Sequence, residues 1–248
     1  IPLSLRDPIL LARQISALDN LSKGRFILGV GLGAYREEFE AQNISKKINR
    51  GEMFDEALEA LIRLLLHNKA SFRGKYYYFH EIEIWPKPIQ NPLPIYIGGN
   101  SLQNVKRAVK YRIGWMPAGL TPEEIQLIIS ASETHNQLHG DFSNMEIAPQ
   151  LTVCIAESNE KAIRIYKNSQ IYEHDLSLKE STFKSQDVEK EIGARDLIGT
   201  VDEIIKRIEN YRKLGINHLP ALIFINDSIE GVNKSIHLFA NEVMPSFI

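Results

Sequence analysis

The segment Gly29-Val30-Gly31-Leu32-Gly33 follows an apolar run, and its glycines could bring a flat ring close to the backbone. Glycine accepts a positive φ and has no Cβ to hold a ligand away. In an α/β barrel, the carboxyl ends of the strands carry the active site. No acidic residue ends a second strand at the distance that a dinucleotide fingerprint requires. We expect Gly31 and Gly33 to line a cofactor ring; a plain strand-to-helix turn is the alternative.

Charged residues follow this glycine segment directly. Arg36, Glu37 and Glu38 could reach a ligand across the same edge, as an acid–base group beside a reacting ring would have to. We therefore take Arg36 and Glu37 as candidate catalytic residues. The alternative is a solvated first turn of a helix, which we favour for Glu38.

A second glycine pair lies after the apolar run at residues 95–97. Gly98 and Gly99 are followed by Asn100 and Ser101, which open a helix. Backbone N–H groups at a helix start attract anions, and barrel phosphate sites commonly use such a junction. We expect these four residues to hold a cofactor phosphate. Ser101 could equally serve only as the helix cap.

Two further residues are candidates for cofactor contact. Arg50 precedes a long helix and could pair with a phosphate or carboxylate, although a lone arginine more often forms a surface ion pair. Trp115 ends an expected strand beside Gly114 and could form the wall of a pocket for an aromatic ring. Ordinary core packing is the alternative for this tryptophan.

Metal and thiol chemistry receive little support from the sequence. His135 and His139 share a helix face, but no glutamate stands beside His135 and no third ligand is evident. We expect no metal site. The single cysteine, Cys154, lies in an apolar run and is expected to be a buried structural thiol. No nucleophile elbow and no phosphate loop of the Walker type occurs.

The elements that must position these residues alternate between short apolar strands and longer amphipathic helices, which is typical of parallel α/β architecture. Core strands are expected at 25–30, 95–97, 113–116, 148–155 and 218–225. Helices are expected at 8–21 and 48–67, and from Ser101, Thr121, Ser158, Thr200 and Ser228 onward, and residues 71–78 are expected to form a hairpin around Gly74.

These five strands predict a TIM (β/α)8 barrel that lacks about three βα units at its N-terminus, since eight strands close the barrel. We expect residues 1–248 to form a single, N-terminally incomplete barrel domain. The polar, aperiodic stretch at 174–193 is expected to be an insertion or lid.

Composition excludes several partner classes. The 248 residues carry a net charge of −2, with Lys and Arg dispersed among acids, so no nucleic-acid surface is expected. No apolar run reaches the roughly 18 residues of a membrane span. Residues 1–8 lack the features of a signal peptide, so a cytoplasmic location is expected. The chain lacks an initiator Met. If the polypeptide starts at Ile1, the barrel is open and exposes strand edges, so that a monomer would aggregate or pair with a partner, and we expect a homodimer.

Taken together, the segments resemble the bacterial luciferase-like oxidoreductases over nearly the whole chain and in the right order. The residues that carry the resemblance are 8–12, 18–25, 29–33, 36–39, 50–51, 54–57, 86–88 with Gln90, 97–101, 114–117 and 239–245. The resemblance implies a TIM barrel that binds reduced FMN or a deazaflavin coenzyme of the F420 type at the carboxyl edge of its strands. It also places residues 3–6 at the end of the third strand and 26–30 in the fourth.

The resemblance implies a flavin- or deazaflavin-dependent oxidoreductase, of the monooxygenase class, acting on an unidentified small organic substrate. Two departures bear on this. The turn before the first helix reads Arg6-Asp7-Pro8, without the histidine usual in the family, and Ile113 replaces the usual acid before Gly114. A non-catalytic flavin-binding relative, or a flavin-independent barrel enzyme acting on a sugar phosphate, are therefore the alternatives.

Overall fold

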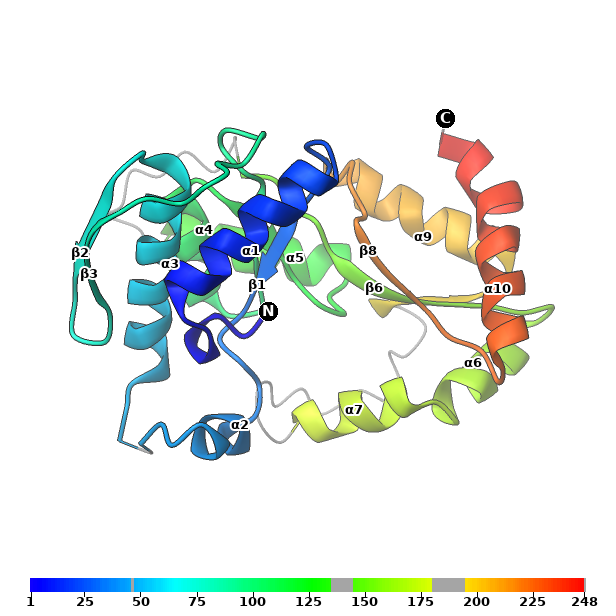
Figure 1. The fold of residues 1–248 in the computed structure, drawn as a ribbon. Helices are drawn as coiled ribbons and strands as arrows, with labels where there is room; N and C mark the ends of the chain where they lie inside the picture. The colour runs from blue at the N-terminus through cyan, green and yellow to red at the C-terminus, as the bar shows by residue number, and fades with distance from the viewer. Residues whose placement is uncertain (46, 135–144, 180–194, 248) are drawn as a thin grey trace. The chain divides into compact units, whose positions relative to one another are not determined.

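The computed structural model describes residues 1–45, 47–134, 145–179 and 195–247, which divide into two compact units, Ile1–Gly98 and Gly99–Ile248 (Figure 1). Both units combine parallel strands with helices, so the chain has an α/β fold. Within the described residues, none of the helices combines the length and the apolarity that a membrane span needs.

The N-terminal unit pairs two parallel strands and adds a hairpin. Leu28 of β1 faces Ile95 of β4, and Val30 faces Ile97. Pro2 forms a parallel bridge with Gly31 on the other edge of β1. The elements are η1 (Leu3–Leu5), α1 (Pro8–Leu21), β1 (Leu28–Val30), α2 (Arg36–Ala41), α3 (Arg50–Leu66), β2 (Ala70–Arg73), β3 (Tyr78–Ile82) and β4 (Ile95–Gly98).

The helices of this unit begin where the sequence predicts. The Asp7 carboxylate accepts the Leu10 N–H at 2.8 Å, and Pro8 occupies the first turn of α1. The Asn49 side chain caps α3 by accepting from the N–H groups of Gly51 and Glu52. The buried stripe of α3 packs against α1 and η1. The strand expected at 25–30 is shorter, because β1 is limited to Leu28–Val30.

A buried carboxylate joins the proline-rich loop to α1. Both Asp19 oxygens accept from Gln90, one from its backbone N–H at 2.9 Å and one from its side-chain amide at 2.7 Å. The same amide donates to the Phe26 carbonyl just before β1. Burial opposes the ionised form, but these hydrogen bonds outweigh it and lower the pKa of Asp19. The loop before β4 is thereby fixed to the entry of β1.

The hairpin is held on α3 by a second carboxylate. Glu56 accepts the Lys75 N–H at 2.9 Å and the Tyr76 N–H at 2.8 Å. A Cβ at Gly74 would lie inside the contact distance of the Glu56 carboxylate, so the turn needs glycine there. The hairpin expected around Gly74 is confirmed, and it lies beside α3 (Figure 1). Its Phe72 and Phe79 are buried.

The C-terminal unit is built on β6, which pairs in parallel with two strands. Val153 of β6 faces Leu197 of β7, and Gln150 faces Ala221 of β8. The elements are α4 (Leu102–Tyr111), β5 (Gly114–Met116), α5 (Pro122–Thr134), β6 (Gln150–Ile155), α6 (Asn159–Lys167), α7 (Gln170–Lys179), β7 (Leu197–Gly199), α9 (Val201–Lys213), β8 (Ala221–Phe224), α10 (Ile229–Leu238), η3 (Phe239–Val243) and η4 (Met244–Phe247).

Hydroxyl caps begin five helices of this unit, at the positions expected from the sequence: Ser101, Thr121, Ser158, Thr200 and Ser228. At two of these starts, the acid three residues later accepts the N–H of the cap residue in return, so that capping boxes form between Thr121 and Glu124 and between Thr200 and Glu203. The start of the expected lid at 174–193 is helical, since α7 continues to Lys179. The rest of that stretch, 180–193, lies outside the described residues, and the lid stays a prediction.

Sequence analysis missed the three-residue strand β7, and side chains help to hold its backbone. The Asp196 carboxylate accepts the Thr152 N–H of β6 at 2.7 Å. Arg207 donates to the carbonyls of Asp196 and Ile198. Asp196 lies in a buried position, and burial raises the pKa of this carboxyl to about 7.

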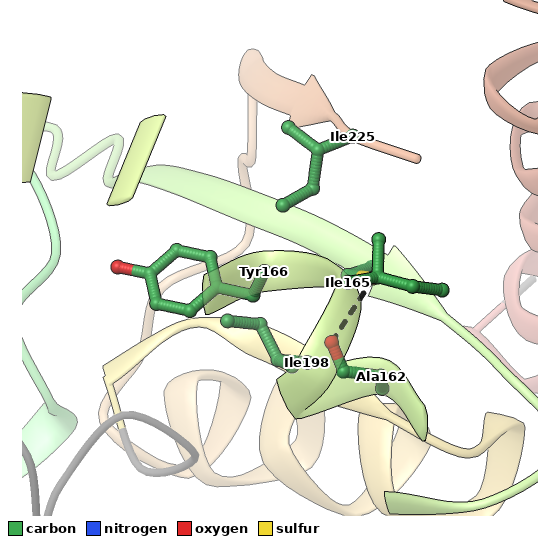
Figure 2. Close-up of a cluster of buried hydrophobic side chains, with 6 residues drawn as sticks. Ala162, Ile165, Tyr166, Ile198 and Ile225 are labelled. Atoms are coloured by element: carbon green, nitrogen blue, oxygen red, sulfur yellow. Dashed lines mark hydrogen bonds between the residues drawn. The ribbon is translucent and has the colours of Figure 1, made fainter. Parts of the chain in front are cut away.

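An apolar cluster lies beneath β7 (Figure 2). Ile198 and Ile225 meet the α6 side chains of Ala162, Ile165 and Tyr166. Cys154 belongs to the same cluster, and its thiol donates to the Ala162 carbonyl at 3.5 Å. Burial raises the pKa of Cys154 to about 11, which keeps the thiol protonated. The expectation of a buried structural thiol is confirmed.

Replacing Asp196 by asparagine should change how stability depends on pH. The folded pKa is raised from 3.8 to about 7, so the fold favours the protonated form. The stabilisation is complete below the unfolded pKa and is lost as pH rises through about 7. The asparagine amide would keep an oxygen acceptor for Thr152 without ionising. We expect D196N to gain unfolding free energy over the wild type as pH rises, measured by urea titration from about pH 4 to about pH 8.

The matched control is Asp202→Asn, which removes an exposed aspartate from the first turn of the neighbouring helix α9. D202N should follow the wild-type pH dependence. A constant difference between D196N and wild type across the range would contradict the buried-carboxylate assignment.

Candidate functional site

The carboxyl end of β1 has one packed face and one open face. Leu28 and Val30 are buried, at 1% and 2% exposure. A Cβ added at Gly29 or Gly31 would meet no described atom within 4 Å outside its immediate chain neighbours. Side chains alternate along a strand, so these two glycines share the face opposite Leu28 and Val30. The chain therefore presents bare backbone at this face, as a flat ring would require.

Residues 1–3 lie along one edge of β1 and form backbone hydrogen bonds with Gly31. The Gly31 N–H donates to the Ile1 carbonyl at 2.9 Å, and the Leu3 N–H donates to the Gly31 carbonyl at 3.0 Å. The hydrogen-bonding groups of Gly31 are thus used within the sheet. Any ligand contact at Gly31 would be made through the face of its peptide plane.

Gly33 lies where the chain turns from β1 towards α2. Its φ is +89°, a value that residues with a Cβ rarely adopt. An added Cβ would also approach the buried Phe39 ring to 3.0 Å. Gly33 is therefore required by the turn itself, and its expected contact with a ring stays a prediction.

Arg50 of α3 reaches back to this turn. Its guanidinium donates to the Gly33 carbonyl at 3.3 Å, and its central carbon lies 5.4 Å from the centroid of the Phe39 ring. Arg50 thus joins the Gly33 turn, α2 and α3. The expected partner of Arg50 was a phosphate or carboxylate, whereas the partners in the structure are a carbonyl and an aromatic face.

Arg36 and Glu37 begin α2, three and four positions after Gly33. Both are exposed, and Glu37 and Glu38 lie in the first turn, where the helix dipole favours acids. The N-terminal unit thus brings Arg50 against the Gly33 turn after β1, and Arg36 and Glu37 follow that turn at the start of α2. Their roles in catalysis or binding stay predictions.

The second glycine pair follows β4, and Gly98 is its last residue. Gly99 opens the C-terminal unit with φ at +108°, and an added Cβ would lie 2.7 Å from the Asn104 side-chain nitrogen. Its N–H donates to the Met116 carbonyl at 3.2 Å. Gly99 is therefore held against the end of β5, in a conformation that glycine alone accepts readily.

Asn100 and Trp115 brace this turn. The Asn100 amide donates to the Ala118 carbonyl at 2.8 Å and accepts the Ala118 N–H at 2.9 Å. The Trp115 indole is fully buried and donates to the Gly99 carbonyl at 2.9 Å. Both side chains thus position the Gly99 backbone, and direct contact with a cofactor stays a prediction for each.

Ser101 caps α4, with its hydroxyl accepting the Asn104 N–H at 3.3 Å. A helix start of this kind attracts anions, because its first N–H groups have no acceptor within the helix and the Ser101 cap satisfies that of Asn104. The structure brings Gly99, Asn100, Ser101 and Trp115 together at this turn. These contacts give the helix start a rigid backbone, which suits a phosphate.

Sequence analysis missed two buried polar residues behind this turn. Asn104 accepts from the Arg107 guanidinium at 3.0 Å, and both side chains are only 6% exposed. They lie on α4 next to the buried Val105 and Ala108. Polar residues inside an otherwise apolar helix stripe are the signal that could have marked them.

Within the described ranges, no three His, Cys, Asp or Glu side chains form a group able to hold a metal ion. His135 and His139 lie outside the described residues, so the structure does not test them.

Comparison with known proteins identifies a family and several similar sequences. The sequence model of the luciferase-like monooxygenase family matches residues 1–218. An uncharacterized protein of Mycobacterium tuberculosis is 31% identical over 145 residues, which are 58% of this chain and 49% of the relative. The chain thus spans about half the length of these curated relatives. The oxygenase component of a flavin-dependent trigonelline monooxygenase from Acinetobacter baylyi is 23% identical, over 97% of this chain and 72% of its own.

Solved structures match over nearly the full chain. The monooxygenase RslO1 from Streptomyces bottropensis has a TM-score of 0.80 at 23% identity, covering 99% of this chain and 76% of its own. An F420-dependent secondary alcohol dehydrogenase has a TM-score of 0.76 at 22% identity, covering 98% and 76%. The oxygenating constituent of 3,6-diketocamphane monooxygenase from Pseudomonas putida has a TM-score of 0.70 at 19% identity, covering 99% and 78%. The fold is shared with all three.

Gly31→Val tests the open face of β1 directly. Valine suits a strand, and its Cβ has space at this position, so the melting temperature should stay near that of the wild type. We expect binding of FMN or the deazaflavin coenzyme to weaken roughly tenfold or more, measured by fluorescence titration. Gly99→Val is the less informative variant, because its Cβ would strain the turn itself. Unchanged affinity in a folded G31V would contradict ring contact at this face.

Proposed function

Because the chain belongs to the luciferase-like monooxygenase family, we propose that it is a flavin- or deazaflavin-dependent oxidoreductase acting on a small organic substrate. The observation that carries this proposal is the open face at the carboxyl end of β1, where Gly29 and Gly31 leave bare backbone with room for a ring. The reduced cofactor, when bound, supplies the electrons for hydride transfer or oxygen activation.

Similar proteins with named cofactors support the choice of ring. The structural relatives include a dehydrogenase in complex with an F420–acetone adduct and a Baeyer–Villiger monooxygenase in complex with FMN. Both cofactors combine a flat ring system with a phosphate group. The bare backbone face suits the ring, and the rigid start of α4 suits the phosphate. Neither feature distinguishes FMN from the deazaflavin.

We assign the cofactor contacts residue by residue. Gly31 and Gly33 would face the ring, and Gly98 with the α4 start at Gly99, Asn100 and Ser101 would hold the phosphate. Trp115 would act through the Gly99 carbonyl that it fixes. Glu37 is the group that could exchange a proton with the substrate, and the permanently charged Arg36 could stabilise a negative charge on it, since both are exposed a few residues after Gly33.

We further propose that the parallel strands belong to a closed (β/α)8 barrel in which β1 is the fourth strand. The alternation of strand and helix in both units supports this. The chain covers 76% of the Streptomyces monooxygenase. A cytoplasmic homodimer remains our expectation for the assembled protein.

One observation favours a second candidate, a flavin-binding relative without catalysis. Asp7, which stands where relatives usually carry a histidine, is engaged as the cap of α1 through the Leu10 N–H. Its carboxylate thus has a structural task. A relative that binds the ring without turning over substrate would need the glycine face and the α4 start, but no acid–base group at residue 7.

The test is a titration of the full chain with FMN and with the deazaflavin coenzyme, in oxidised and reduced forms, followed by absorbance and fluorescence. We expect saturable binding of one of the two, and oxidation of the reduced cofactor that accelerates with a suitable substrate or oxygen. Saturable binding without turnover would support the second candidate. If the protein binds inorganic phosphate but neither cofactor, both candidate functions are contradicted and a flavin-independent enzyme is favoured.

A further inference from the structure

Arg50 occupies the least favourable end of its helix for a cation. It is the first residue of α3, where the helix dipole is positive, and the Asn49 cap fixes its backbone there. Other interactions must offset this electrostatic cost. In the described residues, the interactions of its side chain are the hydrogen bond to the Gly33 carbonyl and the stack on Phe39.

Both partners of Arg50 belong to the segment that follows β1. Gly33 sets the turn, with its φ of +89°, and Phe39 is the buried residue of α2. The rest of α2 is exposed, and in the part of the chain that the structure describes this short helix packs extensively against no other helix or strand. A hydrogen bond with a charged donor and a cation–π stack are both interactions that hold an exposed segment in place.

We infer that Arg50 is a positioning residue, which clamps residues 33–41 and thereby fixes Arg36 and Glu37 beside the glycine face of β1. The effect of this clamp on catalysis rests on the proposed function, whereas the clamp itself depends only on contacts within the N-terminal unit. It differs from the role of phosphate ligand, in which the guanidinium would contact the cofactor directly.

Arginine is required for this role by its shape. Its planar guanidinium can lie on the Phe39 face while an edge N–H points to a carbonyl, whereas the compact ammonium of lysine cannot do both in the same way. Arg50→Lys should therefore resemble Arg50→Met. For a phosphate ligand, by contrast, lysine would keep the charge and much of the affinity.

The first experiment measures hydrogen exchange of backbone amides in the full chain without cofactor. The reporters are the amides of Gln42, Asn43 and Ile44, which donate to carbonyls of α2. We expect R50M and R50K to exchange about tenfold faster than wild type there, because the clamp no longer holds α2 closed. Exchange in β1 and β4 should not change.

The matched control is Arg63→Met. Arg63 lies on the same helix and stacks on Phe72 with its central carbon 5.5 Å from the ring centroid, but its partners belong to the hairpin and to Glu59. R63M should leave exchange at residues 42–44 unchanged. Wild-type exchange at these amides in R50M would overturn the clamp, whatever cofactor the protein binds.

The second experiment separates positioning from ligand contact. With the cofactor and substrate identified, R50M and R50K should both lower kcat about tenfold or more while the cofactor Kd changes by less than about threefold. A large rise in cofactor Kd in R50M, rescued in R50K, would overturn the inference in favour of a phosphate ligand. Absence of any cofactor binding by wild type would instead refute the proposed function, and the exchange result would stand.

Discussion

The Asp19 carboxylate is the constraint on which the N-terminal unit depends. It lies fully buried on α1, so it must find donors inside the protein, and Gln90 supplies two of them. The same Gln90 side chain reaches the Phe26 carbonyl at the entry of β1. One satisfied carboxylate therefore fixes α1, the loop before β4 and the strand whose end carries the glycine face. The parallel pairing of β1 with β4 follows from this arrangement.

A buried aspartate has a comparable task in the C-terminal unit, with the opposite electrostatic balance. Asp196 accepts one backbone N–H from Thr152 and has fewer donors than Asp19, so burial dominates and its pKa rises. Asp19, with several donors, has its pKa lowered. Burial and the neighbouring Asp175 carboxylate thus raise the pKa of Asp196, whereas the hydrogen bonds from Gln90 lower that of Asp19, although both carboxylates help to fix the entry of a short strand.

The candidate site relies on backbone more than on side chains. Gly31 offers space, Gly33 and Gly99 supply conformations with positive φ, and the start of α4 supplies N–H groups. Side chains nearby act mainly on this backbone: Arg50 on the Gly33 carbonyl and Trp115 on the Gly99 carbonyl.

The sequence by itself determined the helix starts, since caps such as Asp7 and Thr200 act through neighbours three residues away. It also located the glycine turns, because positive φ is a local property. Only the tertiary structure decided the short strand β7, whose backbone is held by Asp196 and Arg207, and the partner of Arg50, which lies 17 positions earlier. Local hydrogen bonds and dihedral preferences can be read from neighbouring residues, whereas the partner of a long side chain depends on which distant segments the fold brings together.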